Sequence, residues 1–255
     1  MTGVASSTRQ LIEVMGTVIT VDLFNCSDAA GADAAISRAR TLLQDVDRVF
    51  STYKESSPIS RLRRGEISLG ETPPQVADVL ERCKEAKRIT AGWFDPWAMP
   101  GGVDPTGYVK GWAAQLALEE LRGLELIGAI VNAAGDIATF GGPAPGVAFR
   151  TGIVRPDDAQ RIAAVVEVHA GLATSGEAER GAHLYNPFAR SYATAVPSAS
   201  VAGPDLGVCD ALATALSVGG HDVMVMIDEL EDYEAMTIAA DGSMRATAGF
   251  PFVSE

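Results

Sequence analysis

Residues 127–140 read IGAIVNAAGDIATF, two apolar runs separated by a short turn-forming segment. Ile127 to Asn132 and Ile137 to Phe140 are bounded by glycine and aspartate, which is typical of strands joined by tight turns. Similar runs follow at 146–154, 161–169, 235–239 and 244–247. Helical patterns lie mostly outside this region, so helices and strands come in blocks. This order favours an α+β fold over a doubly wound parallel sheet.

The flanking regions supply the remaining predicted elements. A strand rich in β-branched residues is expected over Leu11 to Phe24, with Gly16 marking a bulge or a close approach of a ligand. Helical spacing predicts helices over 28–49, where Asp28 is a candidate cap, and over 73–90, 109–122 and 210–218. A short strand is expected over 224–227. We find no repeat and no convincing linker, and we expect residues 1–255 to form one domain.

Composition narrows the class of protein. A chain of 255 residues with 47% hydrophobic content can bury a substantial core, and its mean hydropathy is +0.13. The net charge of −13 argues against a general nucleic-acid binder, which needs clustered basic residues. No stretch is long enough to span a membrane and no export signal is visible, so we expect a cytoplasmic protein without membrane insertion. Three widely spaced cysteines predict neither a disulfide framework nor a zinc site.

Asp210 and Thr214 are the hydrophilic pair near the start of an apolar run, Val208 to Gly220. Their i, i+4 spacing puts a carboxylate and a hydroxyl on one helix face, and we place them in the first turn, where backbone N–H groups are unpaired. Such a pair could hold a hard cation that carries a phosphorylated ligand. Two alternatives stay open: Asp210 could be a simple N-cap, and Thr214 could bond a carbonyl one turn back.

Several other segments combine polar and aromatic residues in ways unusual for a core or a surface. They are Met15-Gly16-Thr17, residues 50–54 and 57–62, Phe94-Asp95-Pro96, Asp104 to Trp112, Asn132 to Ile137, Ala173 to Gly176, and His183 to Pro187. Together with Asp210 and Thr214, and in this order, they resemble the signature of the FAD:protein FMN transferase family, the ApbE family. The resemblance spans nearly the whole chain and is far more specific than any single segment.

The resemblance implies an ApbE-like, T-fold-like α+β architecture of mixed sheets with packed helices, a single unit of two intertwined subdomains. It implies FAD as the substrate, Mg²⁺ as the cofactor, and transfer of FMN to a Thr or Ser in a short exposed motif of a partner flavoprotein. The residues that match its flavin-binding positions are Met15, Tyr53, Trp93, Phe94, Asp95, Asp104, Lys110 and His183. Those that match its metal positions are Gly107, Asp210, Ala213 and Thr214, and His183 matches the proposed catalytic base.

Each of these residues also has an ordinary structural interpretation. Tyr53 could be a surface tyrosine, Asp104 a turn residue, and His183 a structural histidine. The chain departs from the family pattern at Ala134, where a glycine is usual, and at Asn186, where an aspartate is usual. Two other functions remain open: hydrolysis of FAD to FMN and AMP, and flavin binding without catalysis. The segment Ala173 to Gly176 is expected as a turn in the wall of the site.

Overall fold

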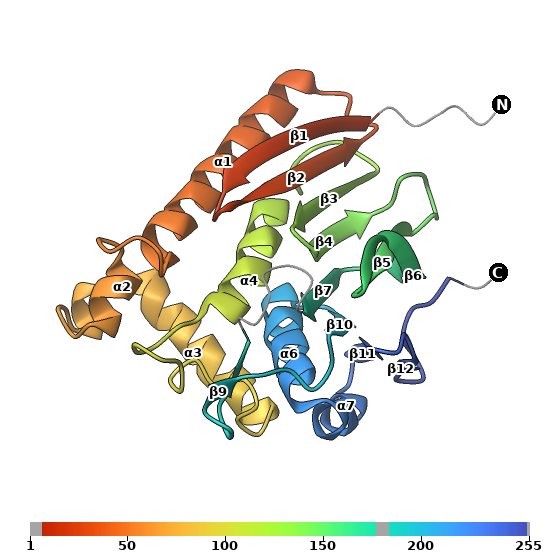
Figure 1. Ribbon diagram of the computed structural model, residues 1–255. Helices are drawn as coiled ribbons and strands as arrows, with labels where there is room; N and C mark the ends of the chain where they lie inside the picture. The colour runs from red at the N-terminus through yellow and green to blue at the C-terminus, as the bar shows by residue number, and fades with distance from the viewer. Residues whose placement is uncertain (1–6, 177–183, 254–255) are drawn as a thin grey trace.

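An eight-stranded sheet runs through the computed structural model, which describes residues 7–176 and 184–253 (Figure 1). Its strands follow the order β1-β2-β3-β4-β7-β10-β11-β12, and every neighbouring pair is antiparallel. The α+β class is therefore confirmed. The strands are β1 (Ser7–Val14), β2 (Thr17–Phe24), β3 (Gly128–Ala133), β4 (Asp136–Gly141), β7 (Gly171–Gly176), β10 (Ser198–Gly203), β11 (Glu234–Ile238) and β12 (Met244–Ala246).

The helices gather beside this sheet, with α4 and α6 next to each other (Figure 1). Two small hairpins stand apart from the main sheet. The helices are α1 (Ala29–Phe50), α2 (Pro58–Arg63), α3 (Pro74–Ile89), α4 (Thr106–Glu119), α6 (Leu206–Gly219) and α7 (His221–Asp228), with a 3₁₀ turn at Leu69–Glu71. The hairpins pair β5 (Phe149–Arg155) with β6 (Asp158–Val168) and β8 (Tyr185–Asn186) with β9 (Ser191–Tyr192). None of the helices in the described ranges is long and apolar enough to cross a membrane.

Helix α1 begins where the sequence predicts it. The Asp28 carboxylate accepts a hydrogen bond from the Gly31 amide at 2.9 Å, which satisfies one of the free N–H groups at the helix start. The apolar face that includes Ala35, Leu43 and Val49 is fully buried against the main core. Helix α3 also matches its prediction within one residue at each end.

The single strand predicted over 11–24 is instead the hairpin β1–β2. Val14 pairs with Thr17, and Met15 (φ 55°) and Gly16 (φ 69°) form the two-residue turn between them. Positive φ at both central residues is the geometry of a type I′ turn, which matches the twist of the flanking strands. The prediction was wrong because the β-branched residues continue through both strands and only Gly16 marks the turn.

Three further predictions are corrected. Residues 224–227 lie in helix α7, since a short apolar run does not by itself distinguish a strand from a buried helix. Residues 173–176 belong to strand β7, not to a turn. Helix α6 begins at Leu206, four residues before its predicted start, because Asp205 is the N-cap and accepts from the Val208 amide at 3.0 Å. Asp210 therefore lies in the second turn, among paired amides, and is not the cap.

Helices α4 and α6 pack unusually closely, and Gly111 makes this possible. A Cβ at position 111 would lie 2.3 Å from the Leu206 carbonyl oxygen and 3.0 Å from the Asp210 Cβ. Nothing larger than glycine therefore fits between the two helices. In the eight-stranded sheet, the pairing between β4 and β7 is short and involves only Ile137 and Ala138 of β4. The crossing helices and these two strands together position the side chains described next.

Candidate functional site

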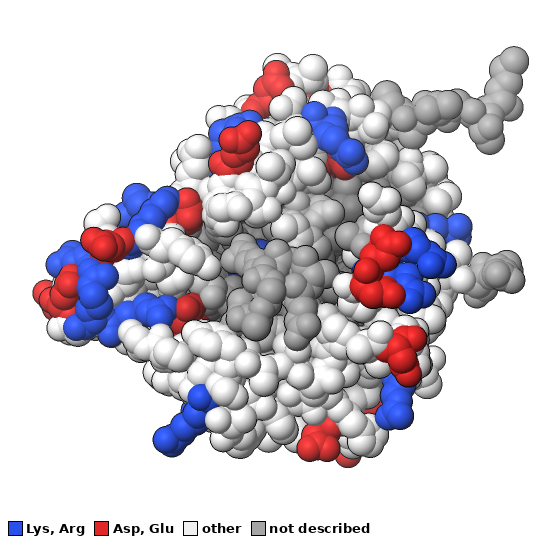
Figure 2. Space-filling view, in the orientation of Figure 1, with Lys and Arg blue, Asp and Glu red and all other residues white. Residues whose placement is uncertain are grey.

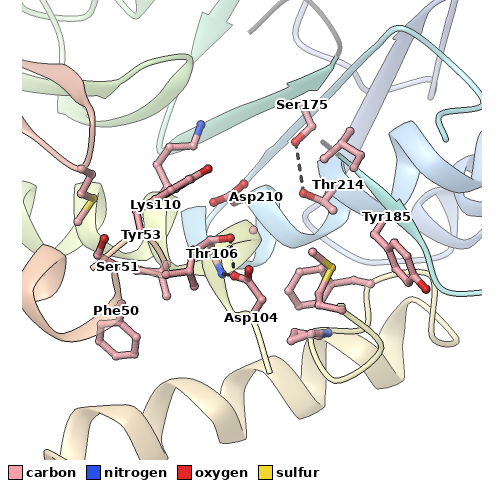
Figure 3. Close-up of a pocket in the computed structure, with 18 of the residues that line it drawn as sticks. Phe50, Ser51, Tyr53, Asp104, Thr106, Lys110, Ser175, Tyr185, Asp210 and Thr214 are labelled. Atoms are coloured by element: carbon pink, nitrogen blue, oxygen red, sulfur yellow. Dashed lines mark hydrogen bonds between the residues drawn. The ribbon is translucent and has the colours of Figure 1, made fainter. Parts of the chain in front are cut away.

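A cavity of about 560 Å³ lies between the end of α1, the segment 93–110, helix α6 and strand β7. Its volume is in the range of small-molecule and cofactor sites. Ten of the twelve predicted site residues line it: Met15, Tyr53, Trp93, Phe94, Asp95, Asp104, Gly107, Lys110, Asp210 and Thr214. Residues that are far apart in the sequence are thus brought to one place, and Figure 3 shows several of them.

The other two predicted residues do not join this lining. Ala213 is fully buried within α6 and does not line the cavity. His183 lies outside the described residues.

Asp210 is the most deeply placed polar group of the lining. Its side chain is buried, and its Oδ2 accepts a hydrogen bond from the Gly111 amide at 3.1 Å. In a regular α-helix this N–H pairs with the carbonyl four residues earlier, which is that of Gly107. The bond to Asp210 therefore ties this turn of α4, which also carries the Gly107 carbonyl, to helix α6.

A second buried carboxylate, Asp136, interacts with Asp210 but does not itself line the cavity. It is fully buried at the start of β4, and Lys110 Nζ lies 3.1 Å from its Oδ2. Neither Asp136 oxygen accepts a hydrogen bond of ordinary geometry from the described residues. Two carboxylates in close contact therefore face one lysine. Asp136 is not among the predicted site residues, although the turn that carries it belongs to one of the segments on which the resemblance rests.

Burial controls the protonation of this acid pair. Removal from water raises the pKa of Asp210 well above its usual range, and the nearby Asp136 charge raises it further. Burial also raises the pKa of Asp136, against the lowering effect of Lys110. Two carboxylates that interact this strongly share protons as a pair. Without another cation the pair therefore retains a proton to higher pH than an exposed aspartate does.

Thr214 extends the oxygen donors along α6. Its Oγ1 lies 3.4 Å from Ser175 Oγ on β7, and a Cβ at Gly107 would come 3.1 Å from the same Oγ1 (Figure 3). Carboxylate, hydroxyl and carbonyl oxygens are the ligands of a hard divalent cation. The described residues contain no cluster of three or more His, Cys, Asp or Glu side chains that could hold a metal. The two carboxylates, which share one lysine, and these hydroxyls nevertheless fit Mg²⁺, provided that backbone oxygens or waters complete its shell.

Aromatic side chains also line the cavity, and Phe94 lies beside the oxygen donors, since a Cβ at Gly107 would come 3.3 Å from its ring and 3.1 Å from Thr214 Oγ1. Phe94 is buried, and the ring of Trp93 contacts Phe188 at a centroid distance of 4.7 Å. Tyr53 also lines the cavity, yet 85% of it is exposed, so its ring has little packing against the protein. A flat aromatic ligand could cover that ring by stacking. The cavity therefore combines aromatic side chains with oxygen donors.

Two predicted carboxylates of the lining already bond within the chain. Asp104 Oδ2 lies 2.6 Å from Arg63 Nη1, and its Oδ1 accepts from the Thr106 hydroxyl at 2.7 Å. Asp95 Oδ2 lies 2.8 Å from Lys87 Nζ. These bonds fix the segment 93–110 against α2 and α3. No sequence motif predicted the partners Arg63 and Lys87.

The departure at Asn186 has a structural explanation. Its Oδ1 accepts hydrogen bonds from the amides of Phe188 at 3.0 Å and Ala189 at 2.9 Å, and so closes the β8–β9 turn. An amide oxygen performs this task as a carboxylate would. The departure at Ala134 leaves the turn intact as well, since Ala134 adopts φ 50° and Gly135 φ 94°. Asn132 Oδ1 holds this turn by accepting from the Gly135 amide at 3.0 Å.

Charged side chains on the outer surface are interleaved. At the α2 end of the molecule Lys and Arg stand beside Asp and Glu in Figure 2, and Arg64 bonds Glu66 there at 2.6 Å. On the face shown, no extended basic surface is available for a nucleic-acid backbone. Within the cavity lining, the basic side chains that could meet an anionic ligand are Lys54 and Lys110.

Comparison with known proteins gives a consistent result. A model of the ApbE family matches residues 15–101 and 97–237. The flavin transferase ApbE from Vibrio cholerae superimposes with a TM-score of 0.81 at 20% identity, covering 98% of this chain and 100% of that one. The Pseudomonas stutzeri flavinyl transferase ApbE, in its apo form, gives 0.80 at 19% identity and coverages of 96% and 95%.

The ApbE protein from Thermotoga maritima gives a TM-score of 0.82 at 15% identity, covering 96% of this chain and 98% of that one. At such identities these likenesses establish the fold. No curated protein matched the sequence.

Proposed function

The chain belongs to the ApbE family, and we propose that it is a flavin transferase that moves FMN from FAD to a Ser or Thr hydroxyl of an acceptor flavoprotein. The observation that carries the proposal is the acid pair Asp136 and Asp210, buried beside Lys110 at a cavity that aromatic side chains also line. FAD has the matching composition, a flat ring system joined to a pyrophosphate.

The reaction exchanges one phosphorus–oxygen bond for another. The acceptor hydroxyl oxygen attacks the phosphorus of the FMN half and forms a phosphoester, while the pyrophosphate P–O bond breaks and AMP leaves with its electron pair. The hydroxyl proton passes to a base. Such transfers depend mainly on positioning and on neutralising the charge of the phosphate oxygens.

The residues of this chain would provide that positioning. We assign the isoalloxazine ring to the aromatic side chains, with Tyr53 stacked on it and with Met15, Trp93 and Phe94 nearby. The pyrophosphate would lie toward Lys110, whose ammonium group offsets its charge. Asp95 and Asp104 shape the segment 93–110 through their bonds to Lys87 and Arg63.

Asp210, Thr214 and the Gly107 carbonyl oxygen, which all line the cavity, are the groups that we propose to hold Mg²⁺. The family pattern adds the Ala213 carbonyl oxygen, but Ala213 does not line the cavity and we leave it out of this set. When bound, Mg²⁺ would withdraw charge from the pyrophosphate oxygens. Asp136 would keep Asp210 and Lys110 in place from behind. We assign the role of base to His183 from the family pattern alone.

The proposal is tested by incubating the purified protein with FAD, MgCl₂ and soluble proteins that include candidate acceptors. The expected result is AMP release together with a fluorescent, covalently flavinylated band on a denaturing gel. AMP with free FMN and no labelled protein would indicate a hydrolase. Tight FAD binding without AMP would indicate a flavin-binding protein and contradict the proposal. Asp210→Asn is the matched variant, since it removes one charge and keeps the shape of the side chain.

A further inference from the structure

Arg63, the last residue of α2, holds both ends of the segment that leads to α4. Its Nη1 lies 2.6 Å from Asp104 Oδ2, and its Nη2 donates to the Pro100 carbonyl at 3.0 Å. The two side chains of the ion pair are only 15% and 11% exposed. The pair is therefore better shielded from water than an ordinary surface ion pair.

The backbone between these two contacts lies directly on Arg63. Gly102 has φ +108°, and a Cβ at this position would come 2.7 Å from the Arg63 carbonyl oxygen. Any larger residue would push the segment away from the end of α2. Both the side chain and the backbone of Arg63 thus determine the path of residues 100–104.

Asp104 passes this constraint on to α4. Its second oxygen, Oδ1, accepts from the Thr106 amide at 3.1 Å and from the Thr106 hydroxyl at 2.7 Å, and Figure 3 shows these two residues side by side. Thr106 is the first residue of α4, and its amide is one of those that a helix start leaves unpaired. Thr106, Gly107 and Lys110 all line the cavity.

We propose that Arg63 is a positioning residue for the ligand-binding end of α4. It does not line the cavity. It acts through Asp104. Arg63 orients the Asp104 side chain so that one carboxylate oxygen binds the start of α4, and this holds the Gly107 carbonyl and the Lys110 ammonium at the cavity. The planar fork of arginine reaches two acceptors at once, whereas the ammonium of lysine acts as a point charge. This inference rests on the proposed function, because it takes FAD as the ligand.

The first test uses the ligand-free protein. In Arg63→Gln, amide hydrogen exchange should accelerate in peptides that cover residues 104–110 and stay unchanged in α1. Unchanged exchange over 104–110 would overturn the proposal. The matched control is Arg9→Gln, because Arg9 also makes a two-pronged bond to an aspartate, Asp22, at 2.6 and 2.7 Å, but outside the cavity lining.

The second test is a double-mutant cycle with FAD and Mg²⁺, read by quenching of flavin fluorescence. Arg63→Gln should weaken FAD binding about tenfold and lower kcat/KM by on the order of 10²-fold, as small misplacements of a site do. Combined with Asp104→Asn, it should cause no further loss of affinity. Losses that add in full would show that Arg63 acts independently of Asp104, and would overturn the proposal.

If Arg63→Gln does not fold, Arg63→Lys takes its place. Lysine keeps the positive charge but lacks the planar guanidinium that reaches two acceptors. We expect its loss of FAD affinity to lie between those of the wild-type protein and Arg63→Gln. Wild-type affinity in Arg63→Lys would contradict the need for the fork. Failure of the wild-type protein to bind FAD would refute the proposed function, whereas the exchange measurement would still test whether Arg63 orders the start of α4.

Discussion

Ala134 offers a direct test of backbone strain beside the acid pair. It has a φ of 50° in the turn between β3 and β4, and Lys110 Nζ lies 3.4 Å from its carbonyl oxygen. The left-handed conformation costs a residue with a Cβ about 1–2 kcal/mol. Glycine avoids that cost but gives up about 0.5–1 kcal/mol through its freer unfolded chain. Ala134→Gly should therefore increase the free energy of unfolding by about 0.5–1 kcal/mol.

Thermal unfolding followed by circular dichroism measures this change. For a chain of this size the gain corresponds to a rise in Tm of about 1–4 °C. Ala91→Gly should act in the same direction, because Ala91 has φ 47°. Ala138→Gly is the opposite control: Ala138 is buried in β4 outside the positive-φ region, and the change should lower Tm. A lower Tm for Ala134→Gly would show that the positive φ of Ala134 stores no strain that glycine relieves.

Three further outcomes are expected. Gly111→Ala should lower the free energy of unfolding by about 1–3 kcal/mol, since the new Cβ would lie 2.3 Å from the Leu206 carbonyl oxygen. Gly123→Ala is the control, because no atom lies within 4 Å of a Cβ at that position, and it should lower the stability far less. Thermal unfolding measures both changes. Burial, and then the Asp136 charge, raise the pKa of Asp210. The free energy of unfolding of the ligand-free protein should therefore fall as pH rises from about 3.9 through the raised pKa. Over the same range the Mg²⁺-dependent affinity for FAD should rise by up to about tenfold per pH unit and then level off. Affinity titrations that stay flat from pH 5 to 8 would contradict this. Tyr53→Ala should reduce quenching of bound flavin, and full quenching without the ring would remove the stacking assignment.

Helices α1 and α3 were predicted well because their boundaries have local causes. Asp28 caps α1, and α3 begins at Pro74, directly after Pro73. Helix α4 begins and ends three residues earlier than predicted, and the short helix α2 was not predicted. Short apolar segments were predicted less well. The β1–β2 turn and helix α7 were misassigned because β-branched or apolar runs carry no clear period over four to eight residues. The start of α6 was misplaced because two aspartates, Asp205 and Asp210, each resemble a cap.

The candidate site was predictable as a set of segments, but its arrangement was not. The family resemblance brought forward ten residues that line one cavity. The partners that hold them are long-range: Arg63 lies 41 residues from Asp104, and Gly111 lies 99 residues from Asp210. Such contacts depend on how helices cross, which a single sequence does not reveal. The role of Asp136 beside Asp210 follows from burial, which also appears only in the fold.

The most direct measurement is AMP release from FAD, compared between the wild-type protein and Asp210→Asn, with Mg²⁺ and with EDTA. We expect AMP in amounts equal to the FMN covalently bound to the acceptor. EDTA should abolish this release, and Asp210→Asn should lower it on the order of 10²-fold or more. Equal AMP release by both proteins, or release that is indifferent to EDTA, would contradict a Mg²⁺-dependent transfer centred on Asp210.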